Sequence, residues 1–248
     1  MSKTDNRVAF VTGASRGIGK AIALRLAADG RHVVLASRSE GPLSEVKALI
    51  EESGGSACVC AVDISDRKAF ASVIESKAEE HGRLDILVNN AGITRDNLML
   101  RMSDEEWDAV LETNLTSAFV AIRAAARPMM KGRFGRIVNI ASTSGLVGNS
   151  GQANYAASKS GLVGLTRTIA REIGGKGITA NVVAPGFIQS DMTANLPESV
   201  LDSVKGMIQV KRLGMPEDIA AAVAYVTSDD AGFLTGQVIT VDGGMTMC

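Results

Sequence analysis

Three side chains, Ser142, Tyr155 and Lys159, could together carry acid–base chemistry. Tyr155 and Lys159 are four residues apart, so on a helix they share one face with their Cβ atoms about 5–6 Å apart. An ammonium this close favours tyrosinate, and we expect it to lower the tyrosine pKa from near 10 toward neutrality, a change worth roughly 4 kcal/mol. The pair could then move a proton near neutral pH. Because a Tyr-x3-Lys spacing also arises by chance in helices, its meaning depends on the elements around it.

The segment Thr12–Gly19, with the sequence TGASRGIG, is suited to binding phosphate. It follows the apolar run Val8–Val11 and precedes good helix formers, so the chain turns here from a strand into a helix. A missing Cβ lets the backbone approach a pyrophosphate, and the helix N-terminus favours its negative charge. Tight turns also use glycine for steric reasons. The order strand, turn, helix is nevertheless the one that a dinucleotide site requires, so the sequence predicts a nucleotide cofactor.

The elements that must position these groups alternate regularly along the chain. Apolar runs without polar alternation predict strands that are buried on both faces. These runs are Val8–Val11, Val33–Ala36, Ala57–Val62, Ile86–Asn89, Ile137–Ile140, Thr179–Ala184 and Val238–Val241. Helical periodicity between them predicts helices near Gly17–Asp29, Leu43–Ser53, Arg67–His81, Ser103–Met130, Asn154–Ile173 and Pro216–Thr227. The alternation predicts an α/β fold of the Rossmann type, a doubly wound parallel sheet of seven strands with helices on both faces.

We expect one domain over residues 1–248 that holds both the dinucleotide and the catalytic groups. Within it, the irregular stretch 186–215 is predicted to be a mobile lid over the substrate. The chain carries 26 Lys+Arg against 27 Asp+Glu, a net charge of −1, which argues against a nucleic-acid or membrane-surface binder. The N-terminus lacks the apolar region of a signal peptide, and the sequence has no apolar stretch of about 18 residues, so we expect a cytoplasmic protein.

The histidines and cysteines give no pattern typical of a metal site. His32 and His81 are expected to be isolated near the ends of elements, with no paired ligand spacing, and to have surface or structural roles. Cys58 and Cys60 lie two apart in a predicted strand and therefore share one face. We expect them to be small core residues, with a redox or metal role as the alternative. The sequence thus predicts no metal.

The end of the second predicted strand indicates which dinucleotide is bound. An acidic residue at this place would hold the ribose 2′-hydroxyl of NAD and would repel a 2′-phosphate. This chain has Ser37 and Arg38 there instead, and Arg16 in the glycine-rich turn can approach the same group. We therefore expect NADPH. The alternative is that both arginines are solvated surface charges.

With its Gly-x3-Gly-x-Gly spacing, Thr12–Gly19 resembles the short-chain dehydrogenase/reductase family. The resemblance continues through Asn89–Gly92, Asn114, Ser142, Tyr155-x3-Lys159 and Pro185–Gly186, and it covers essentially the whole chain. It implies the following cofactor-binding residues: Gly13, Ser15, Arg16, Gly17, Ile18, Gly19, Ser37, Arg38, Asp63, Ile64, Asn90, Ala91, Gly92, Tyr155, Lys159, Pro185, Gly186 and Ile188.

The same resemblance implies a division of catalytic roles. Tyr155 would protonate the substrate carbonyl oxygen as hydride arrives at its carbon, and Ser142 would hydrogen-bond that oxygen as it gains charge. Lys159 would hold the ribose of the nicotinamide, and Asn114 would hold a water that passes protons to Lys159. Ser142 lacks the Gly-x-Ser-x-Gly elbow of a hydrolase nucleophile.

Residues 90–102, 151–155 and 184–188 resemble the family members that reduce 3-oxoacyl thioesters on acyl carrier protein in fatty acid biosynthesis. This implies an acyl carrier protein partner, basic docking residues at Arg133 and Lys176, and a homotetramer. Both basic residues could equally be solvated loop charges. Reduction of acetoacetyl-coenzyme A or another carbonyl is an alternative, and a non-catalytic dinucleotide sensor is a further one. Apolar residues that could border an acyl chain, or be plain core, are Leu98, Met99, Leu100, Met102, Phe187 and Met192.

Overall fold

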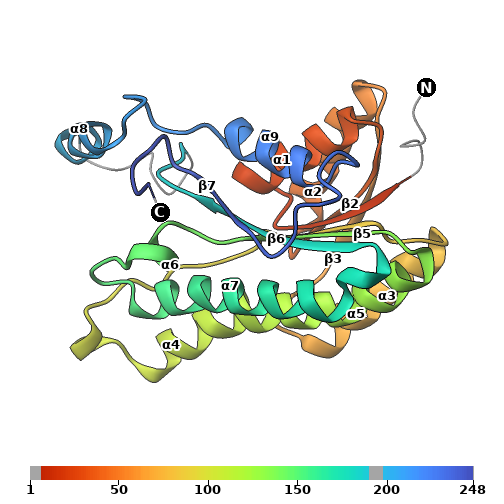
Figure 1. Cartoon of the computed structure of the whole chain (residues 1–248), viewed down its shortest axis with the longest axis horizontal. Coiled ribbons are helices and arrows are strands. Elements are labelled where there is room, and N and C mark those ends of the chain that lie inside the picture. Colours follow the sequence, from red (N-terminus) through yellow and green to blue (C-terminus); the bar gives the residue numbers. More distant parts are fainter. Residues whose placement is uncertain (1–6, 190–197, 248) are drawn as a thin grey trace.

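The computed structural model, which describes residues 7–189 and 198–247, contains one parallel sheet in the strand order β3-β2-β1-β4-β5-β6-β7 (Figure 1). The strands are Val8–Thr12 (β1), His32–Ser37 (β2), Ser56–Ala61 (β3), Ile86–Asn89 (β4), Gly135–Ile140 (β5), Ile178–Pro185 (β6) and Val238–Val241 (β7). All seven predicted strands are therefore present, and the Rossmann-type α/β prediction is confirmed. The strand order reverses at β1, which pairs with β2 on one side and β4 on the other.

Helices cover both faces of the sheet (Figure 1). One face carries Gly17–Ala28 (α1), Glu40–Glu52 (α2) and Pro216–Val226 (α9), and the other carries Arg67–Glu80 (α3), Ser117–Gly132 (α5) and Ala153–Ile173 (α7). Further elements are Met99–Arg101 (η1), Asp104–Leu111 (α4), Glu112–Thr116 (η2), Ser144–Val147 (α6), Gly174–Lys176 (η3) and Glu198–Met207 (α8). In Figure 1, α8 lies at the far end of the molecule from the N-terminus.

Each strand of the sheet supplies side chains to two separate cores. Ala9 and Val11 of β1 pack with Ile22 of α1 on one face, while Phe10 packs with Phe70 of α3 on the other. All five of these side chains are fully buried. Burial of successive residues on opposite faces explains why the strands read as uninterrupted apolar runs.

The predicted helix Ser103–Met130 is divided into three parts. Ser103 and Glu106 form the expected capping box at its start, with Ser103 Oγ accepting from the Glu106 amide at 3.2 Å. After α4, however, the residues of η2 form a π-helical turn before α5 continues. One extra residue in a turn does not interrupt the apolar pattern, so periodicity alone could not predict this feature. Such turns often occur at functional sites, and this one contains Asn114.

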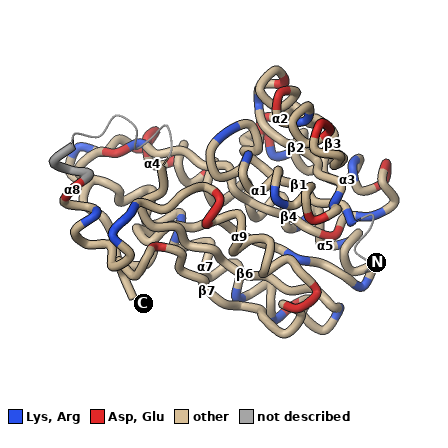
Figure 2. Tube along the Cα trace, turned by 90° about the horizontal axis from the view of Figure 1, so that it is seen from above, with Lys and Arg blue, Asp and Glu red and all other residues tan. Residues whose placement is uncertain are grey.

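Charged residues of both signs are interspersed along the trace (Figure 2), in agreement with the net charge of −1. Within the described ranges, no helix combines the length and apolar character needed to cross a bilayer.

The predicted lid 186–215 is only partly described, because residues 190–197 lie outside those ranges. Its described end packs Val204, Ile208 and Leu213 against Phe187 and Met245.

Candidate active site

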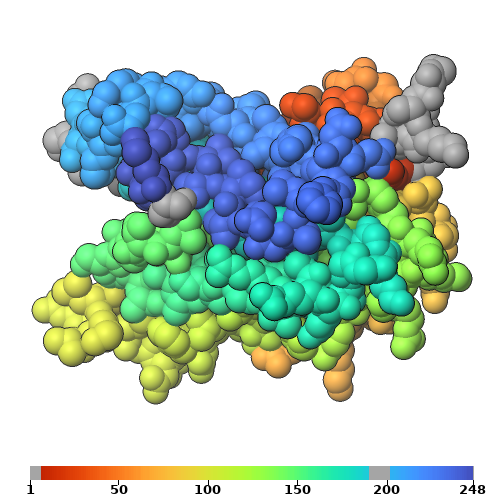
Figure 3. All heavy atoms as spheres, in the orientation of Figure 1, coloured from red at the N-terminus to blue at the C-terminus, as the bar shows by residue number. Residues whose placement is uncertain are grey.

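A cavity of about 970 Å³ opens at the carboxyl ends of the parallel strands, around the point where the strand order reverses. All residues predicted to bind the cofactor line it, and so does Ser142. In Figure 3 the molecule is hollowed on the same side, between the α8 segment and α6. Open α/β sheets place their ligands in this position. The fold thus brings together residues separated by up to 175 positions, from Gly13 to Ile188.

The glycine-rich turn leaves space where a phosphate would lie. Gly13 and Gly17 have φ values of +65° and +53°, which favour glycine. A Cβ on Gly19 would come within 2.1 Å of the Gly13 carbonyl oxygen, whereas one on Gly17 would meet no atom within 4 Å. The N-cap residue of α1, Arg16, makes no side-chain capping bond, and the first turn of α1 carries no acidic residue. The turn therefore fits the pyrophosphate of a dinucleotide.

Thr12 connects this turn to the chain that follows β4. Its Oγ1 accepts hydrogen bonds from the backbone amides of Asn90 and Ala91 at 2.9 and 3.0 Å, and it donates to the Val88 carbonyl oxygen. The Asn90 amide group donates in return to the Thr12 carbonyl oxygen at 3.0 Å. These bonds fix the Asn90–Gly92 segment along the cavity wall. The sequence placed Thr12 within the turn without assigning it this role.

The far end of the cavity carries the residues expected around the second ribose. Ser37 ends β2, Arg38 follows it as an exposed side chain, and both line the cavity together with Arg16. Asp63 Oδ1 accepts from the backbone amide and hydroxyl of Ser65, and these bonds hold the pKa of the Asp63 carboxyl below its usual value, helped by Arg38. No carboxylate stands at the end of β2.

Ser142, Tyr155 and Lys159 converge at the ends of β5 and α7. Lys159 Nζ lies 5.5 Å from the centroid of the Tyr155 ring, in agreement with their shared helix face. Lys159 is buried, and its Nζ donates to the carbonyl oxygen of Ile140, the last residue of β5, at 2.8 Å. Ser142 lies two residues after Ile140 in the sequence, and its Oγ accepts a hydrogen bond from the Ser144 amide.

The expected pKa of Tyr155 is wrong in direction for the chain without cofactor. Burial raises the pKa of the Tyr155 hydroxyl above its usual value, and a hydrogen bond with Ser142 offsets only part of this rise, to which Asp96 adds. Burial also lowers the pKa of Lys159 to about 8. The loss of hydration at both buried groups outweighs the attraction between tyrosinate and ammonium that their spacing suggests. Tyr155 therefore remains a protonated donor near neutral pH.

Asn114 lies behind this group and does not line the cavity. Its buried side chain bonds both backbone groups of Ile93: Oδ1 accepts from the amide at 2.8 Å and Nδ2 donates to the carbonyl oxygen at 3.0 Å. Nδ2 also contacts the Ser158 hydroxyl at 3.2 Å. A Cβ on Gly92 would lie 3.1 Å from Asn114 Oδ1 and 3.4 Å from Lys159 Nζ, so Gly92 separates the two groups.

Several cavity residues had no signal in the sequence analysis. They are Ser39, Pro42, Val62, Ser65, Ile93, Arg95, Thr113, Ile140 and Ala141. Most are adjacent in sequence to predicted site residues, so their position at the cavity follows from chain connectivity. Thr113 differs, because it belongs to the π-helical turn that periodicity did not predict.

The apolar residues considered for an acyl chain have different positions. Leu98, Met99 and Leu100 are 55%, 73% and 93% exposed, so the plain-core alternative is wrong for these three. Phe187 lines the cavity, and Met192 lies outside the described residues.

Arg133 and Lys176 are both exposed, and each precedes a strand: β5 begins at Gly135 and β6 at Ile178. A Cβ on Gly177 would come within 2.5 Å of the Arg133 carbonyl oxygen, so the two loops are in contact. The cavity lies at the other ends of these parallel strands, about 20 Å away along the six residues of β5. The two basic residues are therefore neighbours, but they are remote from the cavity of the same chain.

The expectation that His32 and His81 are isolated is also wrong. Their ring centroids lie 4.5 Å apart, and Cys58 Sγ lies 3.8 Å from His81 Nε2. The register that pairs Val34 with Cys58 places the starts of β2 and β3 side by side, and the end of α3 returns to the same edge. These contacts join residues far apart in sequence, so ligand spacing could not predict them. Cys60 is buried in the core, as expected.

Comparison with known proteins agrees with this geometry. A family model described as enoyl-(acyl carrier protein) reductase matches residues 13–246. The 3-oxoacyl-(acyl-carrier-protein) reductase FabG of Escherichia coli K12 is 47% identical over 243 residues, 98% of both chains. The FabG proteins of Vibrio cholerae and Pseudomonas aeruginosa are each 46% identical, over 98% and 97% of this chain and 98% of their own length. With these matches over nearly its full length, the chain belongs to the short-chain dehydrogenase/reductase family.

Proposed function

We propose that this protein is an NADPH-dependent 3-oxoacyl-(acyl-carrier-protein) reductase that forms the 3-hydroxyacyl thioester in fatty acid biosynthesis. The observation that carries the proposal is the convergence of Ser142, Tyr155 and Lys159 on the cavity that the glycine-rich turn also lines. Relatives that carry this name share 43–47% of their residues with the chain over 96–98% of its length, which supports the substrate class.

A bound nicotinamide nucleotide would supply the hydride for this reduction. Tyr155, which is protonated near neutral pH, gives its proton to the carbonyl oxygen, so that the ketone gains one hydride and one proton and becomes an alcohol. The Ser142 hydroxyl, in hydrogen-bond contact with Tyr155, stabilises the charge that develops on the same oxygen. Lys159 is held in place by the Ile140 carbonyl group and orients the nicotinamide ribose.

Proton return to Tyr155 would pass through the buried side of the site. Lys159 Nζ and Asn114 Oδ1 both border the space that a Cβ on Gly92 would fill. A water held there by Asn114 could hand protons to Lys159. The bonds of Asn114 to Ile93 and Ser158 fix this carbonyl oxygen in one orientation.

The nucleotide is proposed to be NADPH because the end of β2 presents Ser37 and Arg38 to the cavity, with Arg16 nearby. A hydroxyl group and guanidinium groups suit a 2′-phosphate, whereas a carboxylate would suit the free ribose of NADH. The remaining predicted contacts divide by position: Asp63 and Ile64 toward the adenine, and Pro185, Gly186 and Ile188 toward the nicotinamide.

The proposed partner is an acyl carrier protein that docks on Arg133 and Lys176. Both side chains are exposed, but they lie at the edge of the sheet remote from the cavity of their own chain. A carrier protein docked there could deliver its acyl group only to another subunit. The docking proposal therefore requires the homotetramer, in which this edge of one subunit must face the cavity of the next. The segment 186–215 is proposed to close over the acyl group.

A direct assay tests the reaction. NADPH oxidation is followed with acetoacetyl-carrier protein, acetoacetyl-coenzyme A and crotonyl-carrier protein as parallel substrates. We expect reduction of both acetoacetyl thioesters, with a higher kcat/KM for the carrier-bound one. A preference for the coenzyme A thioester would favour the alternative acetoacetyl-coenzyme A reductase, and nucleotide binding without turnover would favour a sensor.

The crotonyl substrate tests a second candidate, because the matching family model is described as an enoyl reductase. Reduction of a carbon–carbon double bond delivers the proton to carbon rather than to oxygen. The contact between Tyr155 and Ser142 suits an oxygen that accepts two hydrogen bonds. We therefore expect no crotonyl reduction, and turnover of crotonyl-carrier protein alone would reverse the assignment.

A further inference from the structure

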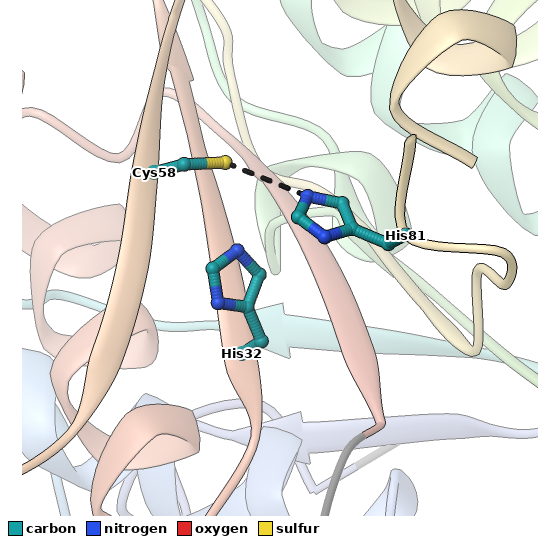
Figure 4. Close-up of side chains that lie close together, drawn as sticks. All are labelled: His32, Cys58 and His81. Atoms are coloured by element: carbon teal, nitrogen blue, oxygen red, sulfur yellow. Dashed lines mark hydrogen bonds between the residues drawn. The ribbon is translucent and has the colours of Figure 1, made fainter. Parts of the chain in front are cut away.

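Three side chains with metal-binding atoms converge at the edge of the sheet opposite the cofactor cavity (Figure 4). His32 is the first residue of β2, Cys58 belongs to β3, and His81 caps the C-terminus of α3. One possible ligand atom from each residue lies within 4.8 Å of the other two. The proposed reductase mechanism uses none of these residues.

The spacing of the atoms is close to that of a coordinated metal ion. In a tetrahedral zinc site, Zn–S bonds of about 2.3 Å and Zn–N bonds of about 2.0 Å place sulfur and nitrogen ligands about 3.5 Å apart. Cys58 Sγ and His81 Nε2 are 3.8 Å apart, so a small adjustment of two side chains would place both at bonding distance from one ion. Two imidazoles and a thiolate form a donor set that zinc binds readily.

His32 is oriented to complete the set. Its Nδ1 is in hydrogen-bond contact with Ser56 Oγ at 2.7 Å. Its Nε2 is buried and, among the residues that the structure describes, finds no hydrogen-bond partner. In Figure 4 the rings of His32 and His81 both turn toward Cys58. Metal-bound histidines commonly use their second nitrogen in a fixed hydrogen bond, and coordination would also satisfy the buried Nε2.

An ion can reach these atoms from solvent. A cavity of about 610 Å³ borders the group, and His32, Ser56 and His81 line it. Gly30, Gly54 and Gly55 also line it and contribute no side chains, which leaves the approach open.

The two arginines that line this cavity, Arg31 and Arg83, each form an ion pair with a carboxylate. Arg31 forms an ion pair with Asp29 at 2.9 Å, and Arg83 forms one with Asp85 at 2.7 Å. Lys77 is similarly paired with Glu80 at 2.6 Å. The second oxygen of Glu80 lies 3.9 Å from His81 Nε2, and it adds negative charge beside the group. These carboxylates therefore reduce the repulsion between the basic side chains and an incoming divalent cation.

We propose that His32, Cys58 and His81 form a binding site for a zinc-like divalent metal ion. Two neutral imidazole nitrogens and one thiolate would bind the ion, with a fourth position open to the cavity. The Cys58 thiol loses its proton to solvent as the metal–sulfur bond forms, and no group changes its oxidation state. The ion would join the starts of β2 and β3 to the end of α3, and it would stabilise the folded chain because it binds this arrangement only when folded.

Cobalt(II), which reports its ligands by absorption, tests the site in the reduced, tag-free full-length protein. We expect one equivalent to give the intense visible bands of tetrahedral cobalt and a near-ultraviolet thiolate-to-cobalt band, both removed by stoichiometric zinc. The Cys58→Ser protein should lose the thiolate band, and His81→Gln should weaken zinc binding on the order of a hundredfold. Ser56→Ala, which removes the bond to His32 Nδ1, should weaken binding about tenfold.

Cys60→Ala is the matched control, since Cys60 lies on the same strand but is buried outside the group. It should keep the full spectrum, and Cys248→Ser should do the same. All variants should retain NADPH-dependent activity, which verifies that they are folded. Zinc should raise the unfolding midpoint of wild type but not of Cys58→Ser. An octahedral cobalt spectrum without a thiolate band, or equal zinc affinity in wild type and Cys58→Ser, would overturn the proposal.

Discussion

The ammonium group of Lys159 donates to the carbonyl oxygen of Ile140 at 2.8 Å, which fixes it at the end of β5. Burial lowers the pKa of this ammonium group to about 8. The charge is therefore retained by one backbone carbonyl group against a large loss of hydration. A lysine whose pKa is about 8 can take up and release protons at the pH values at which enzymes work.

The first prediction is that the kcat/KM for reduction falls as the pH rises through about 8. Below this value Lys159 is charged and can supply a proton toward Tyr155, whereas above it the amine is neutral and the proton is missing. The measurement is a pH profile of kcat/KM, which reports the free enzyme. An NMR titration of Lys159, assigned with Lys159→Met, should have the same midpoint. A profile that stays flat beyond pH 9.5 would contradict the role of Lys159.

The second prediction concerns the proton donor. Tyr155→Phe should lose at least about a thousandfold in kcat, because general acid catalysis contributes on the order of 10²–10⁴ and the phenyl ring has no proton to give. The NADPH dissociation constant should change little, since the ring that packs beside Lys159 is preserved. Single-turnover rates and nucleotide titration of the same protein separate the two effects. Near-wild-type reduction would show that the assigned acid is wrong.

The third prediction concerns the space between Asn114 and Lys159. Gly92→Ala would place a methyl group 3.1 Å from Asn114 Oδ1, closer than Cβ atoms normally approach, and in contact with Lys159 Nζ at 3.4 Å. A displacement of a few tenths of an ångström at catalytic groups should lower kcat on the order of tenfold. Gly41→Ala is the control, because its Cβ would meet nothing within 4 Å. An unchanged kcat in Gly92→Ala would show that protons do not pass through this space.

The sequence predicted the fold and the cofactor turn because both depend on local patterns. An uninterrupted apolar run such as Val33–Ala36 needs helices on both faces, and strands of this kind alternating with helices allow few topologies. The residues expected around the nucleotide line one cavity because they follow the carboxyl ends of parallel strands, which meet at one edge. Motif order and fold class therefore suffice to bring Gly13 and Tyr155 together.

What the sequence could not predict depends on register and on burial. The neighbours His32 and Cys58 meet because β2 and β3 pair in one register, and no property of either residue sets that register. The bond from Lys159 to Ile140 depends on how α7 packs against β5, and it determines how much water the ammonium loses. For the same reason the pKa direction of Tyr155 was wrong, since local spacing contains no information about hydration.

The fourth prediction tests docking of the acidic carrier protein. Changing Arg133 and Lys176 to Glu should raise the KM for the carrier-bound substrate in a salt-dependent way, with little change for a coenzyme A thioester. The control is Lys47→Glu with Lys68→Glu, the same change of charge on α2 and α3. Because the docking residues are remote from their own cavity, the effect should appear only in an oligomer. Equal losses on both substrates would indicate a folding defect instead.

The last prediction is a preference for NADPH over NADH, and it depends on the charges around the end of β2. Ser37, Arg38 and Arg16 line the same part of the cavity, and Asp63, which Arg38 stabilises, has its Oδ1 occupied by the amide and hydroxyl of Ser65. Each well-placed charge-assisted hydrogen bond to the 2′-phosphate contributes roughly 1.5–3 kcal/mol.

Because Arg38 is exposed, solvent reduces this contribution, and two arginines should give a preference on the order of a hundredfold, at 1.4 kcal/mol for each factor of ten. Ser37→Asp combined with Arg38→Gln should reverse the preference, since a carboxylate repels the phosphate and accepts from the free ribose hydroxyls. The kcat/KM for both nucleotides decides the matter, with Lys68→Gln as a control that removes an exposed cation elsewhere. Equal use of NADH and NADPH by wild type would mean that neither arginine engages the nucleotide.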